Sequence, residues 1–299
     1  MNSSHEMQAT QAVDGGGILI LLGTPIGNLS DLSERSIRTL VDADVIAAED
    51  TRRLRVLLSH LHITGKQLLS IDANKEASAV SKVLDLVRAG RTVVYTTDAG
   101  MPGVSDPGAK LVRAVSTAGL RLDAVPGPSA PILAASLSGH CEAGFVFAGF
   151  LSAKAGPRRK SLGDLARSGF AAIVFESPNR IARLLEDARS VYGCDHPLFV
   201  GRELTKVHQE LFYGTISDAL GYFGASAQRG EFVVALGPGE RFNPSEEGLR
   251  ILDGVVGVLG RDGGKTRAVA DELSEITGVG RNQIYEMLLA LREKPGATS

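Results

Sequence analysis

Short apolar runs alternate with helical patterns along the first half of this chain. Four of the runs are Ile18–Leu22, Val45–Ala48, Val93–Tyr95 and Leu122–Val125. Each has the length of a buried strand, and the segments between them repeat apolar residues at the spacing of one helix face, as over residues 76–89. Strands and helices in alternation predict a largely parallel sheet.

A second set of runs follows residue 140. Residues 145–149, 171–175 and 198–201 predict strands, residues 207–213 alternate as in a hairpin partner, and residues 231–236 predict a last strand. The expected fold class is therefore α/β, with two α/β domains and a smaller C-terminal part.

The two ends of the chain have other patterns. The first residues are polar and predict a disordered tail. Helical patterns at residues 269–276 and 282–291 flank the turn Gly278–Gly280 and predict a small module of helix-turn-helix type, which either packs or contacts nucleic acid. The expected parts are a tail at 1–17, α/β domains at 18–140 and 141–240, a linker at 241–248 and a helical module at 249–299.

The amino-acid composition limits the kinds of molecule that this protein can bind. The net charge is −2 over 299 residues, so a contact with nucleic acid needs a local basic patch. Aromatic residues make up 5% and Trp is absent, which argues against stacking on many bases. Cys141 and Cys194 fit no disulfide or metal spacing, which favours a cytoplasmic protein without a metal. No apolar run approaches the length of a membrane span.

Turns of small residues follow several predicted strands. They are GTPIGN at residues 23–28, DAGMPG at 98–103, PGPSA at 126–130, and GPG at 237–239. In open α/β sheets, ligands bind at the carboxyl ends of strands, and small residues let a ligand approach the backbone. None of these turns has the pattern of a dinucleotide or triphosphate loop.

Charged residues follow other predicted strands, at Glu49–Arg53, Glu176–Arg180 and Arg202–Lys206. Acids in a first helical turn favour the helix dipole, but arginines at the same place do not, which favours a functional role. The most basic segment is Lys154–Lys160, and both a solvated helix start and a phosphate-contacting loop remain open for it.

These motifs occur in a specific order: TPIGN, AEDTRR, DAGMPGVSDPG, PGPSA, GFL with a basic tail, FESPNR and RELTK. The series resembles the tetrapyrrole-methylase superfamily over about residues 18–240, and AEDTRR, FESPNR and RELTK are similar to its branch of ribosomal RNA methyltransferases. The chain departs from the usual pattern at Met101, Ser152 and Asn179, where Thr, Pro and His are usual. We therefore assign no catalytic role to a His.

The resemblance implies S-adenosylmethionine as methyl donor in a cleft between the two domains. It also implies 2′-O-methylation of a cytidine in the decoding centre of small-subunit (16S) ribosomal RNA, presented as naked RNA or as the 30S subunit, by a homodimer without a membrane anchor. The donor is expected at Pro25, Ile26, Gly27, Asp98, Ala99, Gly100, Met101, Ser129, Ala130, Phe150, Gly237 and Pro238.

A ribose hydroxyl is a poor nucleophile while protonated, so a base is expected. Each candidate has an Arg nearby in sequence, and pairing makes a carboxylate a weaker base, so the choice among them stays open. The candidate bases are Glu49, Asp50, Glu176 and Glu203. Because Arg and Lys contact phosphates, the expected RNA contacts are Arg52, Arg53, Arg158, Arg180, Arg202 and Lys206.

Two other functions compete. A methylase of a tetrapyrrole or another small molecule would share the donor site, but a ring substrate needs no basic set at the strand ends. A non-catalytic RNA-binding protein would use the C-terminal helices and would not bind the donor. Methyl-transfer assays with both substrate classes and calorimetry with the donor distinguish these hypotheses.

Overall fold

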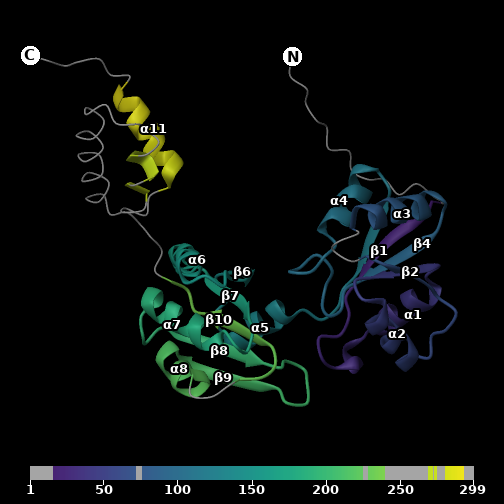
Figure 1. Ribbon diagram of the computed structural model, residues 1–299, viewed down its shortest axis with the longest axis horizontal. Helices are drawn as coiled ribbons and strands as arrows, with labels where there is room; N and C mark the ends of the chain where they lie inside the picture. Colours follow the sequence, from purple (N-terminus) through teal and green to yellow (C-terminus); the bar gives the residue numbers. More distant parts are fainter. Residues whose placement is uncertain are drawn as a thin grey trace, which may run out of the picture. The chain divides into compact units, whose positions relative to one another are not determined.

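The computed structural model describes residues 16–71, 76–224, 228–239, 269–271, 273–274 and 280–292. It divides into two compact units. The larger unit contains residues 1–166 and 170–238, and the smaller contains residues 167–169 and 239–299. Two five-stranded sheets and their helices lie in the larger unit (Figure 1).

The first sheet is entirely parallel, as the alternation of strands and helices predicts. Its order is β3-β2-β4-β1-β5. Val93, Val94 and Tyr95 at its centre have no exposed surface, which explains why this strand reads as a continuous apolar run. The strands are β1 (Ile18–Leu22), β2 (Val45–Ala48), β3 (Gln67–Ser70), β4 (Thr92–Thr96) and β5 (Arg121–Val125).

Helices cover both faces of this sheet (Figure 1). Leu40, Leu54 and Leu58 pack one pair of helices against one face, and Leu111 and Val115 belong to the cluster on the other face. The first pair is α1 (Glu34–Asp42) and α2 (Thr51–His60), and the second is α3 (Glu76–Arg88) and α4 (Ala109–Thr117).

The loops after the neighbouring strands β1 and β4 leave the sheet towards opposite faces. The chain runs from β1 through α1 to β2, and from β4 through α4 to β5. Adjacent strands with diverging connections create a crevice at their carboxyl ends, where ligands bind in open α/β sheets. Thr24 and Gly100 bridge the two loops, with N···O distances of 2.9 and 3.0 Å.

The second sheet is mixed and has the order β6-β7-β10-β8-β9. Strand β9 pairs antiparallel with β8, so the predicted hairpin is confirmed. Strand β10 lies antiparallel between β7 and β8. The strands are β6 (Phe145–Phe150), β7 (Ala171–Glu176), β8 (Pro197–Arg202), β9 (Glu210–Thr215) and β10 (Phe232–Leu236).

The direction of β10 corrects one expectation. Phe232 pairs with Glu176 and Arg202 at the carboxyl ends of β7 and β8, whereas Leu236 pairs with Ala172 and Leu198 near their beginnings. The turn that follows β10 therefore lies at the opposite end of the sheet from the carboxyl ends of its neighbours. The prediction that Gly237 and Pro238 bind the donor places them at an edge shared with the carboxyl ends of β7 and β8, and they do not lie at that edge.

Helices also cover the second sheet on both faces. One face carries α6 (Ala155–Arg167), α7 (Ile181–Tyr192) and α8 (Ile216–Gly224). The other face carries α5 (Ala130–Ser138), whose Ala134 packs in one cluster with Phe199 and Val233. Helix α5 thus packs on the second sheet, although the division at residue 140 assigned it to the first domain.

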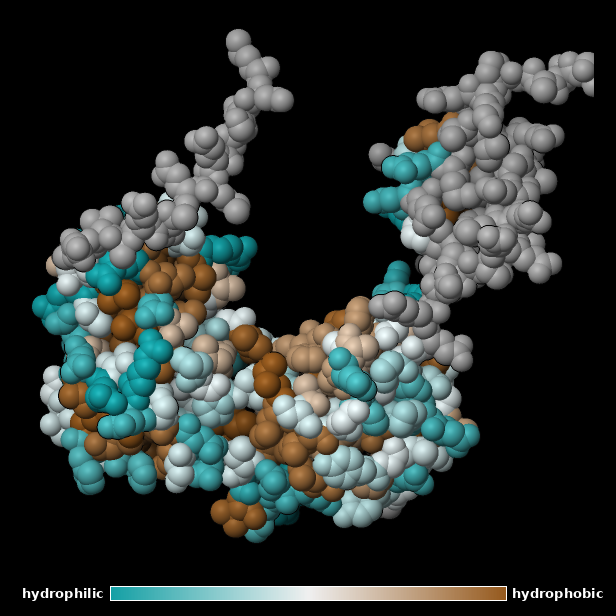
Figure 2. All heavy atoms as spheres, turned by 180° about the vertical axis from the view of Figure 1, so that it is seen from behind, coloured by the Kyte–Doolittle hydropathy of each residue, from teal (hydrophilic) through white to brown (hydrophobic). Residues whose placement is uncertain are grey.

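In the smaller unit, α11 (Arg281–Arg292) places Ile284 and Leu288 against Ala270 and Leu273. The predicted tail falls almost entirely outside the described residues, as does the linker, whereas residues 269–271 and 273–274 of the first predicted C-terminal helix are described and helical. Within the described ranges, every helix is too short or too polar to cross a membrane. Apolar side chains also reach the surface in places, as the brown areas in Figure 2 show.

Candidate active site

A hollow in the larger unit, here called the main pocket, has a volume of about 320 Å³. Residues that follow β1 and β4 of the first sheet line it together with residues at the ends of β7 and β8 of the second. The start of α5 completes the wall with Ser129, Ala130 and Pro131. This volume lies at the lower end of the range for small-molecule pockets.

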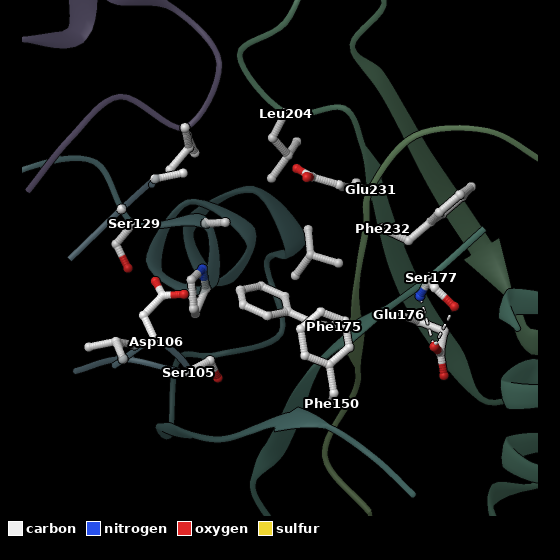
Figure 3. Close-up of a pocket in the computed structure, with 18 of the residues that line it drawn as sticks. Ser105, Asp106, Ser129, Phe150, Phe175, Glu176, Ser177, Leu204, Glu231 and Phe232 are labelled. Atoms are coloured by element: carbon white, nitrogen blue, oxygen red, sulfur yellow. Dashed lines mark hydrogen bonds between the residues drawn. The ribbon is translucent and has the colours of Figure 1, made fainter. Parts of the chain in front are cut away.

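Aromatic and aliphatic side chains form most of the wall of the main pocket. Phe150 and Phe175 lie with ring centroids 5.5 Å apart, and Phe232, Ile26 and Leu204 join them in the lining. Figure 3 shows the two Phe rings between Ser105, Asp106 and Ser129 on one side and Glu176 and Ser177 on the other. Phe150 keeps 61% of its surface exposed, so it is available to cover a bound planar ring.

The polar lining of the main pocket is acidic. Asp106, Glu176 and Glu231 contribute to it, and the described residues that line it include no Lys or Arg. Burial, followed by the charges of Glu49 and Asp98, raises the pKa of Asp106 to about 6. Glu176 pairs with Arg180 and Glu231 pairs with Lys206, so of these three carboxylates Asp106 is the one left to attract a cation.

Asp106 is a site residue that the sequence-based predictions missed. Within the described part of the chain it makes no hydrogen bond or ion pair, although it lines the pocket. The available signal was a second acidic turn, Ser105–Gly108, immediately after the small-residue turn at the end of β4. The direction in which the Asp106 side chain points depends on the conformation of this loop, and residue spacing in the sequence does not predict that conformation.

Gly100 holds the backbone of the main pocket in a conformation that favours glycine. Its φ is +77°, and an added Cβ would lie 3.7 Å from Ile26 Cγ2 and 3.7 Å from the Pro128 carbonyl oxygen. A left-handed backbone costs other residues about 1–2 kcal/mol. These distances are ordinary van der Waals contacts, so glycine is favoured here by the backbone conformation of the turn.

A second hollow, here called the side pocket, has a volume of about 170 Å³. It lies at the carboxyl ends of β2 and β4, beside α2. Arg53 Nη1 and Asp98 Oδ2 form an ion pair at 3.2 Å in its wall. Its polar lining is Thr24, Asp50, Arg53, Thr96, Thr97 and Asp98, and its apolar lining is Pro25, Leu29, Ala48, Leu54, Val56 and Leu57.

The structure brings most of the predicted donor-binding residues together. Ile26, Ala99, Gly100, Met101, Ser129, Ala130 and Phe150 line the main pocket. Pro25 and Asp98 line the side pocket instead. Gly27 lines neither, because its Cα faces the loop after β8, where an added Cβ would lie 2.5 Å from Lys206 Cγ.

The four candidate bases differ in how firmly they are paired. Asp50 caps α2, and hydrogen bonds from Arg52 lower its pKa to about 2. The ammonium group of Lys206 lowers the pKa of Glu203, and Glu176 is buried beside Arg180 at 3.1 Å. Burial and then Asp98 raise the pKa of Glu49, which has no hydrogen bond or ion pair within the described residues.

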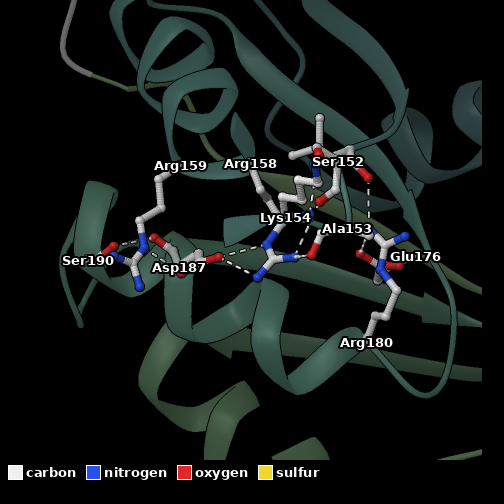
Figure 4. Close-up of polar contacts among 10 residues, drawn as sticks. Ser152, Ala153, Lys154, Arg158, Arg159, Glu176, Arg180, Asp187 and Ser190 are labelled. Carbon is white, nitrogen blue, oxygen red and sulfur yellow. Dashed lines mark hydrogen bonds and ion pairs between the residues drawn. The ribbon is translucent and has the colours of Figure 1, made fainter. Parts of the chain in front are cut away.

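Arg158 is the clear correction among the predicted RNA contacts (Figure 4). Only 3% of its surface is exposed. Its Nε donates to Asp187 Oδ2 at 2.7 Å, and its Nη1 donates to the carbonyl oxygens of Ser152 and Ala153. The prediction of a phosphate contact is wrong because a buried counterion already satisfies the guanidinium group.

The other predicted RNA contacts reach the surface to different degrees. Arg52 is 85% exposed and pairs with Asp50, and Arg53 is 69% exposed. Arg180 donates to the carbonyl oxygen of Leu151 at 2.7 Å. Arg202 pairs with Glu210, and Lys206 pairs with both Glu203 and Glu231. Among the predicted RNA contacts, the two most exposed cations, Arg52 and Arg53, thus lie at the start of α2.

Two β-sheets, each covered by helices on both faces, surround a pocket with aromatic walls and acidic side chains. The family described as tetrapyrrole (corrin/porphyrin) methylases matches residues 19–220, and the chain belongs to it. Curated relatives named ribosomal RNA small subunit methyltransferase I are similar to it. The relative from Synechocystis sp. (strain ATCC 27184 / PCC 6803 / Kazusa) is 39% identical over 92% of this chain and 98% of its own length. The relative from Thermotoga maritima is 41% identical over 74% of this chain and 98% of its own.

Solved structures share the fold at low sequence identity. The methyltransferase CobJ matches with a TM-score of 0.56 and 21% identity over 77% of this chain and 98% of its own. Uroporphyrin-III C-methyltransferase from Thermus thermophilus, solved with S-adenosyl homocysteine, matches with a TM-score of 0.53 and 17% identity over 75% and 98% of the two chains. At these identities the likeness establishes the two-sheet architecture.

Proposed function

We propose that this protein transfers the methyl group of S-adenosylmethionine to small-subunit (16S) ribosomal RNA, forming a 2′-O-methylated cytidine. The names of relatives that match over nearly their whole length support the choice of RNA. The observation that carries the enzymatic part is the main pocket, with its acidic lining and its aromatic walls.

The residues present fit the donor. Ile26, Phe150 and Phe175 offer apolar faces to adenine, and Gly100 and Ala130 leave room beside the backbone. Asp106 offers a carboxylate to the cationic part of the molecule. When bound, the donor supplies an electrophilic methyl group on a sulfonium centre. The absence of Lys and Arg from the described lining favours such a cation over a phosphorylated nucleotide.

The acceptor hydroxyl must lose its proton as the new bond forms. Glu49 and Asp106 are the carboxylates best suited to take it, because neither is paired within the described residues and the pKa of each is raised. Asp106 lines the main pocket, and Glu49 lies outside both linings at the end of β2, next to the side-pocket residues Ala48 and Asp50. Asp50, Glu176 and Glu203 are tied in ion pairs, which suits them to hold arginines and lysines in place. Orientation of the hydroxyl in line with the methyl group contributes further, on the order of 7–11 kcal/mol in favourable models.

A direct assay tests this function. The purified chain is incubated with radiolabelled donor and with 30S subunits, naked 16S RNA or a precorrin-type ring, and the product nucleotide is identified by mass spectrometry. Label in a 2′-O-methylated cytidine is expected from an RNA substrate only. Label in the ring and none in RNA would contradict the proposal, and calorimetry that detects no donor binding would favour a non-catalytic RNA-binding protein.

Substitution of Glu49 by Gln tests the proton acceptor. We expect a fall in the rate of about 10²–10⁴-fold with unchanged donor affinity. Glu34→Gln on α1 is the matched control, because its side chain is 83% exposed and it belongs to neither pocket lining. Full activity of the Glu49 variant would assign the proton transfer to Asp106.

The proposal includes the cellular setting and the assembly state. A protein that modifies small-subunit RNA works in the cytoplasm, and a homodimer is implied by the resemblance to the superfamily. Light scattering of the purified chain tests the dimer, since a mass of one chain at assay concentration would contradict it. Mass spectrometry of ribosomal RNA from cells with and without the protein tests the substrate in its natural setting.

A further inference from the structure

The side pocket is separate from the lining that we assign to the methyl donor. We propose that it binds the base of the acceptor nucleotide and selects cytosine. This inference rests on the proposed function, because it names the group that the same site receives from RNA. Three observations support the inference. They are a buried hydroxyl in the wall of the side pocket, an ion pair whose remaining donors and acceptors can bind a ligand, and the position of the side pocket beside the main pocket.

The first observation is the hydroxyl of Thr97. Thr97 lines the hollow, is 3% exposed, and its Oγ1 has no hydrogen-bond partner within the described residues. Its backbone is held in place, because the hydroxyl of Thr24 donates to its carbonyl oxygen at 3.1 Å. An unsatisfied buried hydroxyl is costly, and a ligand atom in the hollow would satisfy it.

The second observation is the pair formed by Arg53 and Asp98. The pair uses Arg53 Nη1 and Asp98 Oδ2 at 3.2 Å, which leaves the other carboxylate oxygen and the remaining guanidinium donors for a ligand. Together, the Asp98 carboxylate and the Arg53 guanidinium group present a hydrogen-bond acceptor next to hydrogen-bond donors. The Watson–Crick edge of cytosine presents the complement, an exocyclic amine next to the acceptors N3 and O2.

The size and walls of the side pocket suit one base. Its volume is about 170 Å³, against about 320 Å³ for the main pocket, so it falls below the range of about 300–1,000 Å³ that is usual for small-molecule pockets. Apolar side chains from α2, among them Leu54 and Leu57, offer surfaces to the faces of a ring. RNA-binding proteins commonly read single bases that are splayed out of a loop in this way.

The two hollows are neighbours along both loops that form them. In the loop after β1, Pro25 lines the side pocket and Ile26 lines the main pocket. In the loop after β4, Asp98 lines the side pocket and Ala99 lines the main pocket. The bridge between Thr24 and Gly100 joins the two loops at this boundary. A nucleotide with its base in the side pocket would therefore place its ribose near the main pocket, where the methyl group is transferred.

The charged pair predicts a specific order of substrates. Uracil has a carbonyl oxygen where cytosine has its amine, so this oxygen would face the Asp98 carboxylate. Adenine has an amine but one acceptor beside it, and it adds a second ring. Cytosine should therefore be preferred, and an amide at position 98 should weaken the preference because its NH₂ can donate to the uracil carbonyl.

The experiment uses the full chain and 30S particles reconstituted with transcribed RNA. The target nucleotide, located first with the wild-type protein, is cytidine, uridine or adenosine. With the wild-type protein we expect at least tenfold faster methylation of cytidine than of the other two. Asp98→Asn should reduce the cytidine-to-uridine ratio at least tenfold, while donor affinity by calorimetry stays within twofold.

Two further variants separate binding of the base from folding. Asp123→Asn removes a carboxylate of another exposed pair, 3.5 Å from Arg35, and should leave the ratio unchanged. Thr97→Val removes the buried hydroxyl without changing its shape, so methylation should fall at least fivefold while the melting temperature does not decrease. A mere packing role for Thr97 would leave methylation intact.

The outcomes are distinguishable. A wild-type protein that methylates no small-subunit RNA overturns the proposed function and this inference with it. A wild-type protein that methylates its target while Asp98→Asn slows cytidine and uridine equally overturns the base site alone. Comparable methylation of adenosine and cytidine overturns the selection of a pyrimidine.

Discussion

Two arginine pairs that look alike in the sequence differ in the structure, because Arg158 is buried while its neighbour Arg159 keeps 58% of its side chain exposed. Arg52 and Arg53 follow β2 and open α2, where their side chains are 85% and 69% exposed. Arg158 and Arg159 lie in α6, after β6, and both contact Asp187, a carboxylate with 4% exposure that comes from α7. The first pair remains accessible to a ligand, whereas the second holds two helices together.

The comparison shows that a run of positive charge does not by itself identify a nucleic-acid contact. The decisive feature is a counterion remote in sequence. Asp187 is 29 positions from Arg158 and accepts from it inside the protein, while the partners of Arg52 and Arg53 are partly exposed carboxylates near the two pockets. The same chemistry thus holds buried helices together in one half of the larger unit and leaves exposed cations in the other.

The largest expected effect comes from removal of the buried carboxylate. Asp187→Ala leaves the charge of Arg158 buried without a partner, so the free energy of unfolding should fall by about 3–5 kcal/mol, measured by urea denaturation. The matched control is Asp85→Ala, since Asp85 is 71% exposed and 3.4 Å from Arg88, and it should change stability by less than about 0.5 kcal/mol. Equal effects for both variants would remove the distinction between the two arginine pairs.

Arg53→Ala should act on catalysis and spare stability. Loss of a hydrogen-bonded contact to the acceptor costs about 1–3 kcal/mol, so kcat/KM for RNA should fall roughly tenfold to a hundredfold, measured by initial rates. Arg38→Ala is the control, because Arg38 has the same exposure of 69% and pairs with Glu34 on α1. If both variants retain full activity, the accessible pair has no role in the reaction.

Gly100→Ala should lower both the stability of the protein, through strain in the backbone, and its affinity for the donor. The left-handed φ of +77° predicts a loss of about 1–2 kcal/mol of stability. Gly119→Ala has a similar φ of +65° and nothing within 4 Å of the added Cβ, so it should cost as much stability but keep donor affinity. Calorimetry with the donor separates the two, and equal affinities would place Gly100 outside the donor site.

The smallest expected effect is a pH-dependent gain in stability for Asp106→Asn. The folded pKa of about 6 lies above the ordinary value of 3.8, so the contribution of this group to stability is present below pH 3.8 and is lost as the pH rises through 6. At pH 8 the variant should be more stable than the wild type, by less than about 1 kcal/mol because the group is partly solvated. The difference should vanish near pH 4.

The affinity of the wild type for the donor should depend on pH in the opposite direction from the stability contribution of Asp106. The ionised form of Asp106 attracts a cation, so the affinity of the wild type for the donor should fall as the pH decreases below 6, and the affinity of Asp106→Asn should vary less. Calorimetry at pH 5 and pH 8 measures both. A variant that is less stable than the wild type at pH 8 would mean that Asp106 has a structural partner.

The sequence by itself determined the parallel first sheet, the hairpin of β8 and β9, and seven of the residues that line the main pocket. It could do so because alternation of apolar runs and the small-residue turns after β1, β4 and β5 are local properties, and parallel strands bring their carboxyl ends to one edge. The ordered motifs also indicated the family.

Only the tertiary structure decided the rest. The reversed direction of β10 moved Gly237 and Pro238 away from the pocket, α5 packed on the second sheet, and Asp187 buried Arg158. It also turned Asp106 towards the main pocket and left Thr97 unsatisfied in the side pocket. Each of these depends on which distant segment lies beside a residue, because strand direction and long-range charge pairing leave no periodic trace in the chain.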